Sequence, residues 1–290
     1  MRCIAAGIAA SITLLAQQPP ETQELLAALA RTAAWFSRTA PALGAREALL
    51  QRGRRGDMQI LRRGRHGELK EISFTLPNTF ETHEVISDYT MGSSGTAGGF
   101  HEIRNTLLVD NAPPGKYPAV RHAMTLGLDD EDEDVKKKLL ESLELDRLQG
   151  SAADFGPILL LFTATRQRAL SVTSGGRHDL ASGTAWVLNY RQAGEGASMT
   201  EFRNSRAVRH TPEGQIWFRE EDLLPVRITL NSEEVLTPKF TLRNEAEIDY
   251  QPTSFGLAPH LVTHRQYLNQ DLLVENRFVY SDYRGLGIIP

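Results

Sequence analysis

Apolar and polar residues alternate along most of the last hundred positions of the chain. The alternation is clearest between positions 239 and 250, where the apolar residues keep one parity and only Asn244 interrupts them. This apolar set is Phe240, Leu242, Ala246, Ile248 and Tyr250. The same spacing recurs at Trp186, Leu188 and Tyr190, at Val226, Ile228 and Leu230, and at Val274, Phe278 and Tyr280. A period of two puts alternate side chains on opposite faces of a strand, so the pattern predicts a sheet with one apolar and one solvated face.

A period of two also runs from Arg46 to Pro113. GDMQILRRGRHGELKEISFTL carries apolar residues on both sides of a glycine-containing turn and predicts one hairpin. HEVISDYTMG and HEIRNTLLVDN predict a second pair of strands, joined by GSSGTAGG. Strands that follow one another through such turns favour an antiparallel meander.

Three segments have a pattern that is not typical of half-buried strands. The apolar residues of 21–37 recur at helical spacing, with acidic residues in the first turn, and predict an amphipathic helix of about four turns. The segment 128–148 has an acidic start and no glycine or proline, and it predicts a surface helix. The apolar run Ile158–Phe162 fits a buried strand or a helix that begins at Pro157; we favour a short helix, followed by a strand from Ala169 to Thr173.

The composition is that of an ordinary globular protein, with 41% hydrophobic and 23% charged residues among 290. The chain shows no internal repeat, low-complexity tract or long linker. We therefore expect an α+β fold in one domain, residues 19–290, with about a dozen strands and two or three helices.

The first 18 residues resemble a signal peptide. Arg2 precedes the apolar run Ile4–Ala16, which ends in a small residue and is shorter than the ~20 residues of a membrane-spanning helix. Cys3, the single cysteine, lies before this run and not at a lipid-attachment position. The mature chain therefore lacks disulfides, thiolate metal ligands and cysteine nucleophiles, and we expect it in the periplasm or outside the cell.

The charge balance argues against general binding of nucleic acid. The net charge is −4 and becomes −5 when Arg2 is removed, whereas a nucleic-acid binder is typically basic. The basic cluster Arg52–Gly67 fits the solvated face of an exposed hairpin, or a contact with phosphates or anionic head groups.

Two motifs resemble ligand loops only superficially. Four acidic residues occupy the first, third, fifth and twelfth positions of a calcium loop: Asp130, Asp132, Asp134 and Glu141. The sixth position is Val135 instead of glycine, so a charged helix start explains them better. Gly92–Gly99 is rich in glycine but lacks the lysine of a phosphate loop, and we expect a hairpin connection there.

No pattern of catalytic or metal-binding residues is found in the chain. His260 and His264 would face the same side of a strand about 13 Å apart, too far to share one metal ion. No serine has the spacing of a hydrolase nucleophile elbow. Carboxylate pairs of a glycoside hydrolase can come from separate strands, so an envelope hydrolase stays open as a third alternative. We expect no enzyme activity, no metal and no cofactor.

The stretch GQIWFREEDLLPVRITL, Gly214 to Leu230, resembles the central hairpin of the outer-membrane lipoprotein-sorting (LolA-like) proteins. An aromatic strand enters an acidic turn and returns through a proline-containing strand, with Trp217, Asp222, Pro225 and Arg227 at the matching positions. The resemblance extends over residues 183–283. It implies an open half barrel, a large curved antiparallel sheet whose concave apolar face is covered by helices and takes up acyl chains.

From this pattern and this resemblance we expect an exported carrier or binding protein for lipid, lipoprotein acyl chains or another apolar ligand. The apolar lining predicted from the strands comprises Phe240, Leu242, Ala246, Ile248, Tyr250, Phe278 and Tyr280, and the lid comprises Leu25, Leu29 and Phe36. The same residues also fit a packed core beneath the helices. The alternative function is an envelope protein-protein interaction or assembly module without a small ligand, because exposed strand edges readily receive another chain.

Overall fold

The structure, a computed structural model, describes residues 20–54, 79–93, 100–114, 122–127, 151–152, 155–180, 183–193, 198–203 and 206–287. The described part begins with helix α1 (Thr22–Thr39), which a short 3-10 turn, η1 (Ala40–Ala42), joins to the first strand. Helix α1 buries one stripe of side chains: Leu25, Ala28, Leu29, Thr32, Ala33 and Phe36. The leading amphipathic helix predicted from the sequence is therefore confirmed.

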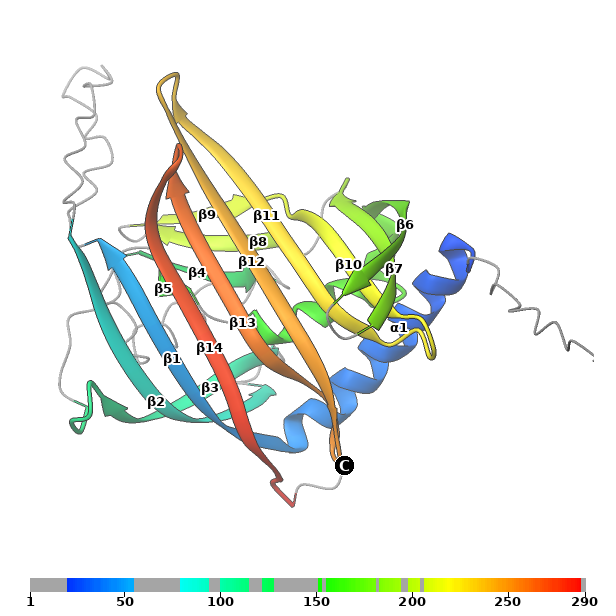
Figure 1. The fold of residues 1–290 in the computed structure, drawn as a ribbon, viewed down its shortest axis with the longest axis horizontal. Helices are drawn as coiled ribbons and strands as arrows, with labels where there is room; N and C mark the ends of the chain where they lie inside the picture. The colour runs from blue at the N-terminus through cyan, green and yellow to red at the C-terminus, as the bar shows by residue number, and fades with distance from the viewer. Residues whose placement is uncertain are drawn as a thin grey trace, which may run out of the picture.

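Ten strands form one antiparallel sheet in the order β3-β2-β1-β14-β13-β12-β11-β10-β7-β6 (Figure 1). They are β1 (Leu43–Arg54), β2 (Phe80–Ser93), β3 (Phe100–Val109), β6 (Leu170–Leu180), β7 (Gly183–Gln192), β10 (Glu213–Arg219), β11 (Pro225–Thr237), β12 (Phe240–Thr253), β13 (Gly256–Leu268) and β14 (Asp271–Gly285). The long strands curve, and within the described residues β3 and β6 do not pair with each other. The sheet is thus an open half barrel, which confirms the expected fold class.

One row of apolar residues crosses nine strands of this sheet, and we call it the apolar row. Each member lies opposite the next in register: Val109, Val85, Leu49, Phe278, Val262, Ile248, Ile228, Ile216 and Leu188. All nine are buried. The alternation in the sequence has this cause, because residues two apart on a strand share a face and only one face is covered.

The covered side of the sheet, which we call the inner face, packs against helical segments. Segment η3 (Gly156–Phe162) lies between α1 and the sheet, and η4 (Arg166–Ala169) follows it. In Figure 1, α1 runs obliquely behind the strands. The outer face carries ion pairs between neighbouring strands, such as Arg265 with Glu275, and is the solvated side that the sequence predicts.

A second, four-stranded sheet in the order β5-β4-β8-β9 lies on the same side as the helices (Figure 1). Its strands are β4 (His122–Gly127), β5 (Ser151–Ala152), β8 (Ser198–Arg203) and β9 (Arg206–His210). Strand β5 lies against β14 and β9 lies against β11, so this sheet spans the inner face from β11 to β14. The sequence analysis did not anticipate a second sheet.

Several sequence predictions fall outside the described residues. They are the signal peptide 1–18, the hairpin strands around Met58 and Phe74, the helix 128–148 and the acidic residues of its calcium-loop pattern. The strands that flank Gly92–Gly99 do pair, with Gly92 opposite His101, as a hairpin requires. None of the described helices has the length and apolar character needed to cross a membrane.

Candidate ligand-binding face

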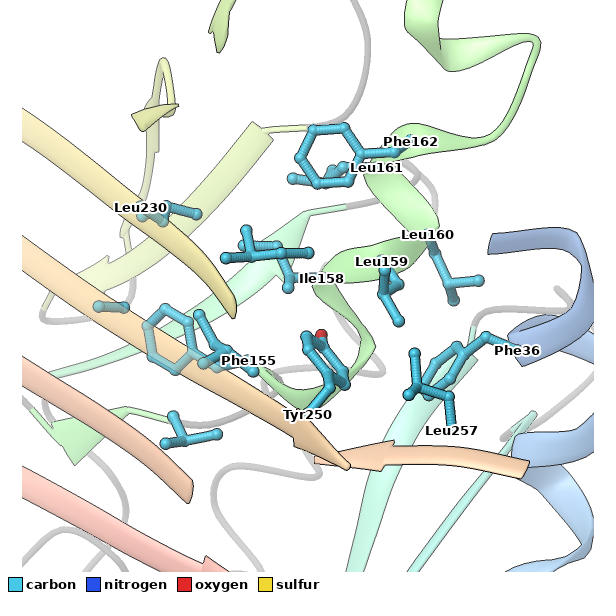
Figure 2. Packing of buried hydrophobic residues seen from close by; sticks show 14 of the residues in the cluster. Phe36, Phe155, Ile158, Leu159, Leu160, Leu161, Phe162, Leu230, Tyr250 and Leu257 are labelled. Carbon is cyan, nitrogen blue, oxygen red and sulfur yellow. The ribbon is translucent and has the colours of Figure 1, made fainter. Parts of the chain in front are cut away.

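Segment η3 occupies the inner face beneath the middle of the sheet. Every residue from Gly156 to Phe162 is buried. Phe162 meets Tyr190 edge to face with ring centroids 5.0 Å apart. Phe36 of α1 meets Tyr250 edge to face as well, with ring centroids 6.4 Å apart. Figure 2 shows Phe162, Phe36 and Tyr250 in one cluster with Leu230 and Leu257 from the strands. Because η3 is sandwiched between α1 and the sheet, it is apolar all round, which explains why its sequence shows no amphipathic period.

Polar contacts hold η3 mainly near its two ends. At the start, Gly156 N–H donates to Glu102 Oε1 (3.1 Å), and the Tyr250 hydroxyl donates to the Gly156 carbonyl oxygen (2.8 Å). At the far end, Gln167 Nε2 donates to the carbonyl oxygens of Leu26 and Phe162, both at 2.9 Å. Between these tethers η3 is held by the packing of its apolar side chains and by one hydrogen bond, which Arg166 Nη1 donates to the Leu160 carbonyl oxygen (3.3 Å).

The tether at Gly156 belongs to a buried charged cluster on β1 and β3. Arg104 donates from Nε and Nη2 to the two carboxylate oxygens of Glu47, both at 2.7 Å, and from Nη2 to Glu102 Oε2 at 2.9 Å. These three side chains are only 1% exposed. Tyr89 donates its hydroxyl to Glu102 Oε1 at 2.8 Å. Glu102 therefore links the sheet's ion pair to the start of η3.

Burial and charge shift the ionisation of this cluster. Burial raises the pKa of Tyr89 well above its usual value, and the nearby carboxylate of Glu102 raises it further. Burial alone would lower the pKa of Arg104, but Glu102 and Glu47 raise it above its usual value. Arg104 is thus a permanent cation that the two carboxylates neutralise.

The predicted lining residues divide between two apolar clusters. The large cluster contains Ala246, Ile248, Tyr250, Phe278 and Tyr280 together with the predicted lid residues Leu25, Leu29 and Phe36. Leu242 instead joins Leu268 and Leu273 in a small cluster, against which Phe240 packs while partly buried. The structure therefore places eight of the ten residues together around η3 and α1. Their role as a ligand lining stays a prediction.

The hairpin residues that resemble the LolA-like motif lie in and beside the turn between β10 and β11. Asp222 accepts hydrogen bonds from Arg219 Nε (2.9 Å) and Leu224 N–H (3.2 Å), and the bond from Arg219 lowers the pKa of this carboxyl. Pro225 opens β11 where the register shifts, a place that suits a residue without an N–H. Arg227 pairs with Asp249 across the outer face at 2.6 Å. Trp217 stacks edge-on against His178. These contacts shape the hairpin and leave the inner face to other residues.

The expectation that His260 and His264 share one side of a strand is wrong. His264 is fully buried on β13, whereas His260 is exposed. The register between β12 and β13 shifts between Asp249 and Tyr250, so that His260 is the extra residue of a bulge. Among the described residues no cluster of three or more histidine, cysteine or acidic side chains could hold a metal ion.

Sequence reasoning missed the polar groups of the inner face. Glu47, Glu102 and Arg104 come from two strands that are not adjacent in the sheet, so no local spacing brings them together. Asn244 was visible as the polar residue that interrupts an apolar alternation. Asn276 likewise interrupts the alternation between Val274 and Phe278. These two asparagines at inward positions are the sequence pattern that indicated polar groups on the inner face.

The strand order and the unpaired edges of the described sheet define an open half barrel. No protein-family model matches the chain, and no curated protein matches it. The chain is similar in structure to a LolA superfamily protein from Nitrosomonas europaea, with a TM-score of 0.36, 9% sequence identity, and coverage of 91% of this chain and 94% of that chain.

Proposed function

We propose that this protein is an exported carrier that holds an apolar ligand, such as lipid or an acyl chain, on the inner face of the half barrel. The observation that carries the proposal is the way η3 is attached. Its apolar side chains fill the inner face, and the tethers to Glu102, Tyr250 and Gln167 lie near its ends. Only the hydrogen bond from Arg166 to the Leu160 carbonyl oxygen joins the middle of η3 among the hydrogen bonds described above. In this proposal η3 is a plug that the chain provides for itself and that a ligand replaces.

The free energy gained by burying the side chains of η3 is comparable to that gained by burying an acyl chain in their place. Burying an aliphatic or aromatic side chain contributes about 1.5–3 kcal/mol, so the five residues Ile158–Phe162 contribute on the order of 10 kcal/mol. An acyl chain of about fourteen methylenes contributes a similar amount at ~0.8 kcal/mol per methylene. A ligand can therefore take the place of η3 without any charged partner, and release it when η3 returns.

Binding of diphenylhexatriene, a fluorescent probe without a polar atom, tests the proposal. We expect saturable binding, together with faster hydrogen–deuterium exchange in the peptide that covers η3 when the probe is present. Exchange accelerates because a displaced η3 loses its cover. Absence of saturable binding would contradict the carrier function, and slower exchange in η3 would contradict its displacement.

The tether at Gln167 provides a first prediction. Gln167→Ala removes both hydrogen bonds that join η3 to α1, so the open state becomes more populated and the apparent Kd for diphenylhexatriene falls by about fivefold. Gln215→Ala is the matched control, because Gln215 donates to Asn189 on the outer face and should leave the Kd unchanged. Equal affinities of the two variants would refute the role of the tether.

A further inference from the structure

Six neutral polar side chains form a continuous patch on the inner face, beside the apolar row. We call it the polar belt, and its members are Gln51, Asn276, His264, Gln266, Asn244 and Ser232. Gln51, Asn276 and His264 lie opposite one another on β1, β14 and β13. Gln266, Asn244 and Ser232 form the next such row on β13, β12 and β11. All six are at most 4% exposed.

The hydrogen bonds of the belt run in one direction. Gln51 Nε2 donates to Asn276 Oδ1 (2.9 Å), and Asn276 Nδ2 donates to His264 Nδ1 (3.2 Å). With Nδ1 as an acceptor, the neutral imidazole carries its hydrogen on Nε2, which donates to Asn244 Oδ1 at 3.3 Å. Each donor thus points toward β12, and the chain of bonds arrives at Asn244.

Asn244 ends this chain with a donor that has no acceptor. Its Oδ1 accepts from both His264 Nε2 and Gln266 Nε2, the second at 2.9 Å, so both lone pairs are used. Its Nδ2 has no hydrogen-bond partner in the described part of the chain. The same holds for Ser232 Oγ, which belongs to the residue directly opposite Asn244. Two adjacent, buried polar groups are therefore unsatisfied.

Leaving such groups unsatisfied is costly, at about 1–3 kcal/mol each. Apolar residues at these two positions would avoid this cost. They would also match the neighbouring inward-facing residues on the same strands, Leu242 on β12 and Leu230 on β11, which are apolar and buried. Asn244 Nδ2 offers donors, and Ser232 Oγ can donate or accept, so the pair fits a group that presents an oxygen acceptor. A charged head group would meet no opposite charge among the six side chains and would be desolvated without compensation.

We propose that Asn244 and Ser232 bind the neutral oxygen-bearing group of the ligand, such as an ester carbonyl or a hydroxyl. This inference rests on the proposed carrier function and names its ligand class as a neutral amphiphile. The apolar chain of the ligand replaces η3, and its neutral head reaches the polar belt. The second sheet spans the inner face from β11 to β14 and encloses this end of the site.

Ser232→Ala tests the proposal, because it removes the hydroxyl and changes little else. Wild type and variant are titrated with diphenylhexatriene, which is then displaced with monopalmitoylglycerol or with hexadecane. We expect the variant to bind monopalmitoylglycerol about fivefold more weakly, the loss of one hydrogen bond, and to bind diphenylhexatriene and hexadecane unchanged. Ser87→Ala is the matched control, since Ser87 Oγ is also buried without a hydrogen-bond partner but lies on β2, outside the belt.

Each outcome of this experiment decides one of the two proposals. If Ser232→Ala and Ser87→Ala give the wild-type ratio of the two competitors, internal water satisfies the belt and the inference is overturned, while diphenylhexatriene binding still supports the carrier. If wild type binds no diphenylhexatriene, the carrier function fails and the inference fails with it. Asn244→Leu serves as a second variant; it also deprives His264 and Gln266 of their acceptor, so its loss should exceed that of Ser232→Ala.

Discussion

Arg104 is the residue on which the charged cluster of the inner face depends. It is the cation that Glu47 and Glu102 share, and all three side chains are buried. Arg104→Met leaves both carboxylates buried without their partner, and removal of one member of a buried pair typically costs about 3–5 kcal/mol. Urea unfolding of the variant should therefore show a loss of stability of that size.

The matched control is Arg265→Met on the outer face. Arg265 pairs with Glu275, but its side chain is 45% exposed, so solvent already screens the interaction. The expected loss is below about 1 kcal/mol. If the two variants lose the same stability, the cluster at Arg104 is not a buried ion pair in solution.

Burial of single residues could be predicted from the sequence wherever the period of two was regular. Leu242, Ile248 and Phe278 are buried as their parity requires. Partners from distant strands could not be predicted. Glu47 on β1 and Arg104 on β3 contact each other across β2, which lies between their strands in the sheet. A polar residue at an inward position, such as Asn244, marks a buried contact in the sequence but does not identify the other side chains that form it.

Among the elements, η3 shows how a tertiary setting decides a local structure. The run Ile158–Phe162 is compatible with a strand or a helix, and its surroundings give a 3-10 helix because both of its sides face apolar neighbours. Pro157 near its start supports a helical turn, which the sequence indicated. The direction of η3 across the inner face depends on the tethers at Glu102 and Tyr250, which lie far away in the sequence.

Gly156 is the position at which η3 can be loosened selectively. A Cβ there would lie 2.3 Å from Glu102 Oε1 and 2.9 Å from the Tyr89 hydroxyl, so Gly156→Ala must displace a buried hydrogen-bonded carboxylate. We expect a loss of about 1–3 kcal/mol in the free energy of unfolding, and faster hydrogen exchange confined to η3. In Gly92→Ala the added methyl would meet only Ile103 Cδ1 at 3.4 Å, an ordinary contact, and stability should barely change. Unaltered stability of Gly156→Ala would show that Glu102 does not hold η3.

At the scale of the whole molecule, the sequence predicted the class of fold but not the order of its strands. Alternation shows which face of each strand is buried, and an open antiparallel sheet follows from many such strands in one chain. The pairing of β1 with β14 joins the first and last strands of the described chain, and β7 pairs with β10 across the intervening β8 and β9. These contacts depend on the closing of long loops, for which local sequence carries no signal.

The inner face as a whole should make the protein sensitive to alkali. Burial raises the pKa of five tyrosines above the usual value: Tyr89, Tyr190, Tyr250, Tyr280 and Tyr283. Because their pKa values are raised in the folded state, the associated stability is fully present below the unfolded pKa of about 10 and is lost as the pH rises above it. Each tyrosine that ionises only in the unfolded chain adds about 1.4 kcal/mol per pH unit to this loss.

Five such tyrosines together give a slope on the order of 7 kcal/mol per pH unit, so the sheet should unfold cooperatively within about two units above pH 10. Tyrosinate absorbance and circular dichroism should change together, because the hydroxyls ionise only when the sheet opens. Tyr280→Phe removes one ionisable group and should reduce the slope by about a fifth, since each of the five tyrosines contributes equally. Tyrosinate formation in a protein that keeps its circular dichroism would mean that water already reaches the inner face, and that η3 does not seal it.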